Sequence, residues 1–428
     1  MRQLAASTPE QRARVRVLFY GQSLCRQEWT ALVETRLRAA FPHADLTVVN
    51  RAVGGFPTQM LIDSAEHDLY PFYPDLLILQ VQGDHYKYAE IVARVRQRTT
   101  AEILIVNDIV TWLPSGEPEA DREQLKGYEW SERYSYELLP EIAAKYGCEL
   151  ADVRTPWRRY LQEHRLPYTA LLDHTRHMNA HGNFLLAELV FRYLRCRPAQ
   201  AVGSESGVIR DYVVGREIAW RDGRLALEFE GNRVEAIAAP GSAGTAAARV
   251  LLDGGAPTSM PELYVFTRPN DVPGTDWPWN VWSMYRVSAE APLIAETWTL
   301  RITETTEDNS EFAFEVAGAV TGPDGRGVNT RRFVSNSGRV VIEPEHWHIK
   351  RAGDLVKRRM PAGTEIVWQA VPLGCDVCRP PRVQDASREA AITLAQGVRN
   401  GVHRLELIAD GGRPPALKAL RVYRPVSQ

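Results

Sequence analysis

The sequence predicts an α/β fold for residues 1–197, followed by an all-β region. In the first part, short and nearly continuous apolar strands alternate with amphipathic helical segments, a pattern typical of a parallel sheet covered on both faces. Beyond residue 210 the helical periodicity disappears, and short strands alternate with glycine-rich turns. We therefore expect a flavodoxin-like, three-layer parallel sheet joined to a β-sandwich or jelly roll.

The individual elements follow from this hydrophobic periodicity. In the N-terminal half, strands are expected at residues 15–20, 46–49, 76–81 and 103–106, and helices at 28–40, 89–98, 134–146 and 183–194. Parallel strands joined by helices should form right-handed crossovers. In the C-terminal half, the expected strands are 225–229, 233–238, 248–252, 297–303, 311–316, 339–342, 366–371, 402–408 and 417–423.

The chain has 428 residues, a length that predicts two or three domains. Residues 198–210 are small and polar and are interpreted as a linker between a domain at 1–197 and a β region at 211–428. The similar segments ARVLLDGG and HRLELIADGG flank a long middle portion. One interpretation therefore treats 260–395 as an inserted β unit.

Composition and charge exclude several classes of function. The formal net charge is −2, so no global field favours nucleic acid or an anionic membrane, and no basic run with interleaved aromatic residues is present. No apolar stretch reaches the roughly 18 residues that a membrane span requires. The first residues lack the apolar run of a signal peptide, which predicts a cytoplasmic protein, with secretion left open for a trimmed chain.

The cysteines are few and mostly isolated. Five cysteines, an odd number, do not predict a disulfide framework. Cys375 and Cys378 form a lone CxxC, for which a disulfide, a partial metal site and two unpaired thiols all remain open. No cofactor is expected.

A serine directly after a buried strand is the first candidate catalytic group. Gly21, Gln22 and Ser23 follow the strand at 15–20 and precede a helical pattern. This places the hydroxyl at the carboxyl edge of a parallel sheet, where open α/β folds bind ligands. Backbone N–H groups at the start of a helix can also stabilise an oxyanion. The alternative is that Ser23 only caps the helix.

A histidine-rich turn before the last helical segment is the second candidate. It contains Asp173, His174, His177 and His181. A serine nucleophile needs a neutral imidazole to take its proton and an acid to fix the tautomer, and Asp173 and His177 supply both. The alternatives are a solvated turn or a zinc site, since residues 177 and 181 have i, i+4 spacing.

Together these segments resemble the blocks of the SGNH/GDSL hydrolase superfamily. The resemblance covers about residues 14–196, and its blocks occur in the expected order along the chain. They lie at Gly21-Gln22-Ser23, at 50–55 with Gly55, at 82–85 after the third strand, and at 173–177.

The resemblance implies ester hydrolysis through an acyl-enzyme. In this scheme Ser23 attacks the ester, His177 acts as base and then as acid, and Asp173 orients the imidazole. The backbone N–H groups of Ser23 and Gly55 hold the oxyanion. Removing one such donor typically lowers the rate by about 10²–10³.

Two positions depart from the family pattern. The asparagine of the third block is replaced by Asp84 or, one residue later, by His85. Because a carboxylate repels a developing oxyanion, we expect His85 to be the donor. His177 follows Asp173 by four residues rather than three, so the turn must let the carboxylate reach Nδ1.

The β region resembles the jelly-roll modules that accompany some SGNH carbohydrate esterases. This resemblance implies an acetyl ester on a carbohydrate or another small substrate, with no nucleic-acid or membrane partner. An acyl transferase would use the same nucleophile. The alternative function is a catalytically silent scaffold carrying a carbohydrate-binding β module, and the aromatic residues 277, 279, 282 and 285 suit either sugar stacking or core packing. The oligomeric state is not predicted.

Overall fold

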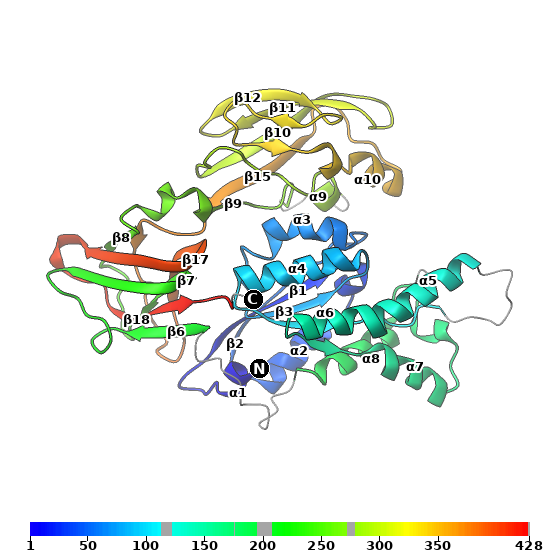
Figure 1. Cartoon of the computed structure of the whole chain (residues 1–428), viewed down its shortest axis with the longest axis horizontal. Coiled ribbons are helices and arrows are strands. Elements are labelled where there is room, and N and C mark those ends of the chain that lie inside the picture. The colour runs from blue at the N-terminus through cyan, green and yellow to red at the C-terminus, as the bar shows by residue number, and fades with distance from the viewer. Residues whose placement is uncertain (113–121, 175, 195–207, 272–278, 427–428) are drawn as a thin grey trace.

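The computed structural model describes residues 1–112, 122–174, 176–194, 208–271 and 279–426. An N-terminal α/β unit is followed by two large antiparallel sheets and a two-stranded one (Figure 1). The coarse prediction, an α/β part and then a β-rich part, is therefore confirmed. The parallel sheet has the order β2-β1-β3-β4-β5, with strands β1 (Arg14–Gly21), β2 (Asp45–Asn50), β3 (Leu76–Gln80), β4 (Glu102–Val106) and β5 (Glu149–Ala151).

Helices cover both faces of this sheet (Figure 1). One face packs against α1 (Arg2–Ala5), α2 (Trp29–Ala40), α7 (Arg154–Glu163) and α8 (Ala180–Phe191). The other packs against α3 (Thr58–Asp68), α4 (His85–Arg98) and α6 (Leu139–Lys145). Successive residues of β1 alternate between the two cores, since Val17 and Phe19 join the first and Leu18 and Tyr20 join the second.

Shorter elements connect these helices. α5 (Arg122–Arg133) continues through a π-helical turn, η2 (Tyr134–Leu138), into α6. The 3₁₀ turns η1 (Ser23–Arg26) and η3 (Tyr168–Leu171) precede α2 and α8. The Asn179 side chain caps α8 by accepting a hydrogen bond from the backbone N–H of Gly182. None of the described helices is both long and apolar enough to cross a membrane.

The first antiparallel sheet joins strands from both ends of the C-terminal region. Its order is β16-β8-β17-β7-β18-β6. β7 and β17 are long, so the segments expected as two strands at 225–229 and 233–238 form one. The strands are β6 (Ile209–Val213), β7 (Arg224–Ala238), β8 (Ala248–Leu252), β16 (Val377–Cys378), β17 (Ala391–Ala409) and β18 (Leu417–Tyr423).

The second antiparallel sheet lies between β8 and β16 in the chain and has its own core. Its order is β12-β11-β10-β15-β9, and we call the described residues from Tyr264 to Pro372 the middle β unit. Its strands are β9 (Tyr264–Phe266), β10 (Glu296–Thr305), β11 (Phe312–Gly318), β12 (Gly322–Val328) and β15 (Glu365–Pro372), with the pair β13 (Phe333–Val334) and β14 (Val341–Ile342). Its helices are α9 (Trp279–Trp282) and α10 (Ile349–Val356). Short 3₁₀ turns complete the region: η5 (Pro257–Ser259), η6 (Pro261–Leu263), η7 (Pro344–His346) and η8 (Asp410–Gly412).

The middle β unit packs on α3 of the α/β unit (Figure 1). Polar contacts join the two along the helix. Asp63 pairs with Arg286, Asp68 pairs with Arg268, and His67 Nδ1 lies 2.9 Å from the Phe266 carbonyl oxygen. α3 is thus buried on two sides, and the middle β unit lies beside the end of the parallel sheet that carries Ser23.

Candidate active site

Ser23 lies at the carboxyl ends of two neighbouring strands. β1 ends at Gly21, where a Cβ atom would come within 1.9 Å of the Gln80 carbonyl oxygen on β3, so only glycine fits. Gln22 then donates its backbone N–H to the same oxygen at 3.2 Å, and Ser23 begins η1. In a sheet of order 2-1-3-4-5, the gap between β1 and β3 is the switch point at which ligands bind.

A glycine loop lies against Ser23. Val53 donates its backbone N–H to the Gly21 carbonyl oxygen at 2.8 Å, which holds the loop to the end of β1. A methyl group on Gly54 would lie 3.8 Å from Ser23 Cβ. Gly54 thus lies next to Ser23, and the oxyanion role expected for the backbone N–H of Gly55 stays a prediction.

Trp282 of α9 holds the other side of this loop. Its indole Nε1 donates to the Gly54 carbonyl oxygen at 2.9 Å. Gly55 has a φ of +82°, and a methyl group there would come within 2.3 Å of Trp282 Cζ2. The aromatic cluster noted in the sequence therefore includes a structural partner of the second block. Trp277, another member of that cluster, lies outside the described residues.

The loop that carries His177 is closed by its own backbone. Asp173 donates its N–H to the His177 carbonyl oxygen at 2.7 Å, and His177 donates its N–H to Asp173 Oδ1 at 3.2 Å. The carboxylate therefore accepts from the backbone of His177.

The His177 loop also contacts the turn that begins at Ser23. Met178 donates its backbone N–H to Gln27 Oε1 at 2.9 Å, and Gln27 directly follows η1. A second contact between the same two parts of the chain is the hydrogen bond from the Trp29 backbone N–H to Asn183 Oδ1, at 3.0 Å. From the second block, Asn50 Nδ2 donates to the Cys25 carbonyl oxygen at 2.7 Å. Three segments that are distant in the chain thus meet around Ser23.

The third block is arranged differently. The Asp84 carboxylate accepts hydrogen bonds from the backbone N–H groups of Tyr86 and Lys87, at 2.8 and 3.1 Å, and so caps α4. His85 is partly buried, with its ring centroid 4.0 Å from that of Tyr86 and 6.3 Å from that of Trp130. Asp84 is committed to the helix, and an oxyanion role for His85 stays a prediction.

The other candidate groups have local partners. His181 Nε2 lies 2.9 Å from the Tyr160 hydroxyl, and no group of three metal-ligating side chains is assembled within the described ranges. Cys375 and Cys378 are free thiols, and burial raises the pKa of Cys375 to about 11 and that of Cys378 to about 12. Thiols with such pKa values are poor nucleophiles at neutral pH.

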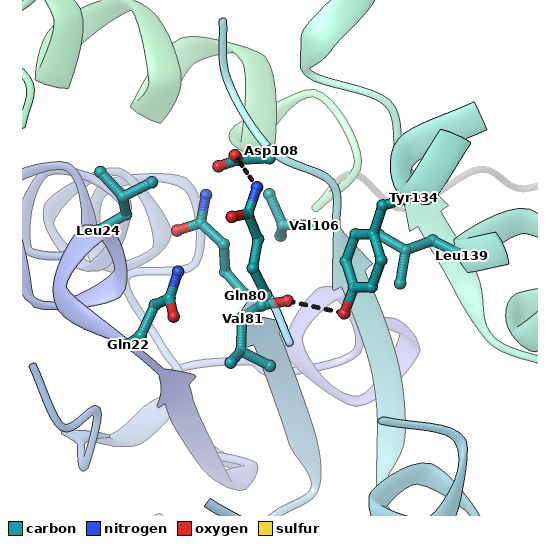
Figure 2. A pocket seen from close by; sticks show the side chains of 9 residues that line it. Gln22, Leu24, Gln80, Val81, Val106, Asp108, Tyr134 and Leu139 are labelled. Carbon is teal, nitrogen blue, oxygen red and sulfur yellow. Dashed lines mark hydrogen bonds between the residues drawn. The ribbon is translucent and has the colours of Figure 1, made fainter. Parts of the chain in front are cut away.

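A polar pocket beside Ser23 was not predicted from the sequence. Its polar side chains are Gln22, Gln80, Gln82 and Asp108, and we call it the glutamine pocket (Figure 2). Gln82 Nε2 donates to the Asp108 carboxylate. Burial raises the pKa of Asp108 to about 6, against the opposing charge of Arg154. Polar residues after adjacent strands β3 and β4 were the available sequence signal.

Asp108 makes the stability of the folded chain depend on pH. Its pKa in the folded chain, about 6, exceeds that of an unfolded aspartate, so the folded chain holds the proton more tightly between pH 4 and 6. The stabilisation that this proton binding gives to the folded chain is largest below pH 4 and is lost as the pH rises through 6. We therefore expect the difference in the free energy of unfolding, Asp108→Asn minus wild type, to become more positive by about 2–3 kcal/mol between pH 4 and pH 7. Urea denaturation at both pH values measures this shift, and a pH-independent difference between the two proteins would contradict it.

No protein-family model and no curated protein matches the chain. Among solved structures, the acetylxylan esterase Axe2 of Geobacillus stearothermophilus is 16% identical, with a TM-score of 0.37, covering 44% of this chain and 98% of that one. LAE5, an alpha/beta hydrolase from the metagenome of Lake Arreo in Spain, is 19% identical, with a TM-score of 0.34, covering 43% of this chain and 97% of that one.

Proposed function

We propose that this chain is a serine esterase in which Ser23 is the nucleophile and His177 the general base. The observation that carries the proposal is the convergence at the β1/β3 switch point. There Ser23 begins a turn, Gly54 lies against its Cβ atom, and the His177 loop is tied to the same turn through Gln27 and Met178. A hydroxyl, an imidazole and backbone N–H groups at one edge of a sheet are the parts that acyl transfer requires.

In the proposed reaction, Ser23 Oγ attacks the ester carbonyl as His177 takes its proton. Backbone N–H groups of Ser23 and the Gly54–Gly55 loop stabilise the oxyanion, with His85 as the further donor predicted from the sequence. The carbon–oxygen bond to the alcohol then breaks, and His177 returns the proton to the leaving oxygen. Water hydrolyses the acyl-enzyme by the same proton transfers in reverse, and Asp173 orients the imidazole.

Catalysis in this scheme requires a hydrogen bond between the His177 imidazole and Ser23 Oγ in the substrate complex. Catalytic hydrogen bonds are often long without ligand and shorten in the substrate complex. The proposed substrate is a small ester, with an acetyl ester of a carbohydrate as the preferred case from the sequence.

A catalytically silent scaffold with a carbohydrate-binding β module is the second candidate function. The position of Asp84 favours it, because its carboxylate caps α4 where the family pattern has an oxyanion donor. The two functions are separated by hydrolysis of p-nitrophenyl acetate. Activity that disappears in Ser23→Ala supports the esterase, whereas equal rates for wild type and variant support the scaffold.

Trp282 is expected to act as a positioning residue for the glycine loop. Trp282→Phe keeps an aromatic ring but removes the Nε1–H donor to Gly54. Because the loop N–H groups act on the oxyanion of the transition state, we expect kcat for p-nitrophenyl acetate to fall about tenfold with KM little changed.

The matched control for Trp282 is Trp298→Phe. Trp298 is fully buried in the core of the middle β unit, and its Nε1 has no hydrogen-bond partner among the described residues. Its substitution tests general loosening of that unit. If both variants lose kcat equally, the specific role of Trp282 is refuted.

A further inference from the structure

We propose that the glutamine pocket is a subsite that binds a hydroxyl group of the substrate, next to the ester that Ser23 attacks. This inference rests on the proposed esterase function and adds a substrate class to it, namely esters of alcohols that carry a second hydroxyl. The pocket is lined by Gln22, Gln80, Gln82 and Asp108, together with the apolar side chains of Leu24, Val81, Val106 and Leu139 and with Tyr134, whose hydroxyl donates to the Val81 carbonyl oxygen (Figure 2).

The unsatisfied amide of Gln80 is the first observation. Gln80 is the last residue of β3, and its side chain is only 3% exposed. Neither Oε1 nor Nε2 has a hydrogen-bond partner in the part of the chain that the structure describes. Burying a polar group without a partner costs about 1–3 kcal/mol. A bound group that both donates and accepts a hydrogen bond removes this cost.

The charge of the pocket selects the kind of group. Its polar walls are three neutral amides and one carboxylate, Asp108, which already accepts a hydrogen bond from Gln82. A carboxylate or phosphate ligand would be repelled by Asp108 when that residue is ionised. A neutral hydroxyl fits, because it donates to Gln80 Oε1 and accepts from Gln80 Nε2.

The size of the pocket limits which substrate group can bind there. The cavity volume is about 10 Å³, close to the least that holds a single water-sized group. An acyl chain or a whole sugar ring is therefore too large, whereas one hydroxyl group fits. Gln22 and Leu24, which line the pocket, flank Ser23 in the chain. A hydroxyl bound there thus belongs to the part of the substrate beside the reacting ester.

The test compares two esters of the same size. In 2-hydroxyethyl acetate, a hydroxyl replaces the terminal methyl group of propyl acetate. For the wild-type chain we expect kcat/KM to be about tenfold higher for 2-hydroxyethyl acetate, and in Gln80→Met we expect the ratio to fall to about one. The matched control is Gln396→Met, since Gln396 is a buried glutamine whose amide instead donates to the Pro71 carbonyl oxygen. That control should keep the wild-type ratio.

The outcomes separate this inference from the proposed function. Absence of Ser23-dependent hydrolysis of both esters refutes the esterase and the subsite together. Hydrolysis of both with a wild-type ratio near one, or with the same ratio in Gln80→Met, refutes the subsite alone and leaves a structural water as the occupant. The ratio of the two kcat/KM values in the wild-type chain tests the subsite even if Gln80→Met does not fold.

Discussion

Substitution of Ser23 by alanine is expected to lower kcat for p-nitrophenyl acetate by at least about 10³-fold, towards the uncatalysed rate. Ser23 is the only nucleophile that the proposal assigns, so the variant retains binding groups but cannot form an acyl-enzyme. In serine hydrolases, loss of the nucleophile typically lowers kcat by about 10⁶-fold. Steady-state hydrolysis at neutral pH measures the effect.

Two controls make the Ser23 result specific. Ser259→Ala removes a serine hydroxyl that donates to the Ala256 carbonyl oxygen, well away from the parallel sheet, and should hydrolyse the ester at the wild-type rate. A fluorophosphonate probe should add one adduct to the wild type, on the peptide that contains Ser23, and none to Ser23→Ala. Labelling of another residue, or equal hydrolysis by Ser23→Ala, rules out Ser23 as the nucleophile.

The strands of the α/β unit could be predicted because they are buried on both faces. The segments expected at 15–20, 76–81 and 103–106 correspond to β1, β3 and β4, and no boundary differs by more than one residue. α3 was missed although it too is buried on two sides. One side packs on the sheet and the other on the middle β unit, where His67 and Asp68 are buried with polar partners. Such a helix has no clear polar face, so periodicity does not reveal it.

In the β region, a local turn signal was overridden by contacts with distant residues. Gly231 and Asn232 lie between the two expected strands, yet β7 runs through them without a break. Gly231 is needed because a Cβ atom there would come within 2.4 Å of the Tyr423 carbonyl oxygen. Asn232 Nδ2 donates to the Arg98 carbonyl oxygen, and its Oδ1 accepts from the Tyr73 hydroxyl. Neither partner is near in sequence.

The candidate site likewise combines residues that a local sequence pattern reveals with residues that depend on distant contacts. Ser23 and the His177 turn were found because each carries a short motif beside a predictable strand or helix. Trp282 contacts Gly54, which is 228 residues away in the sequence. No local sequence pattern therefore predicts this contact. The glutamine pocket combines residues after β1, β3 and β4, whose adjacency is fixed only by the strand order.

Removal of the Asp68 carboxylate is expected to give the largest loss of stability. Asp68 is fully buried and accepts hydrogen bonds from Arg268 and Arg51. Arg268, itself nearly buried, also donates to the Arg51 carbonyl oxygen at 3.2 Å, at the start of the glycine loop. Asp68→Ala leaves the Arg268 guanidinium buried without its counter-ion. We expect the free energy of unfolding to fall by about 3–5 kcal/mol, as measured by urea denaturation.

The cause of this loss can be isolated by a second substitution. If the loss comes from an uncompensated buried charge, the double variant Asp68→Leu/Arg268→Met should regain much of it, because both charges are then absent. Glu290→Ala breaks an exposed ion pair with Arg332 in the same middle β unit, so its unfolding free energy should stay close to that of the wild type. A double variant as unstable as Asp68→Ala would show that the pair acts through the shape of the interface rather than through charge. Because the interface on α3 also supports the glycine loop, Asp68→Ala should lower kcat as well as stability.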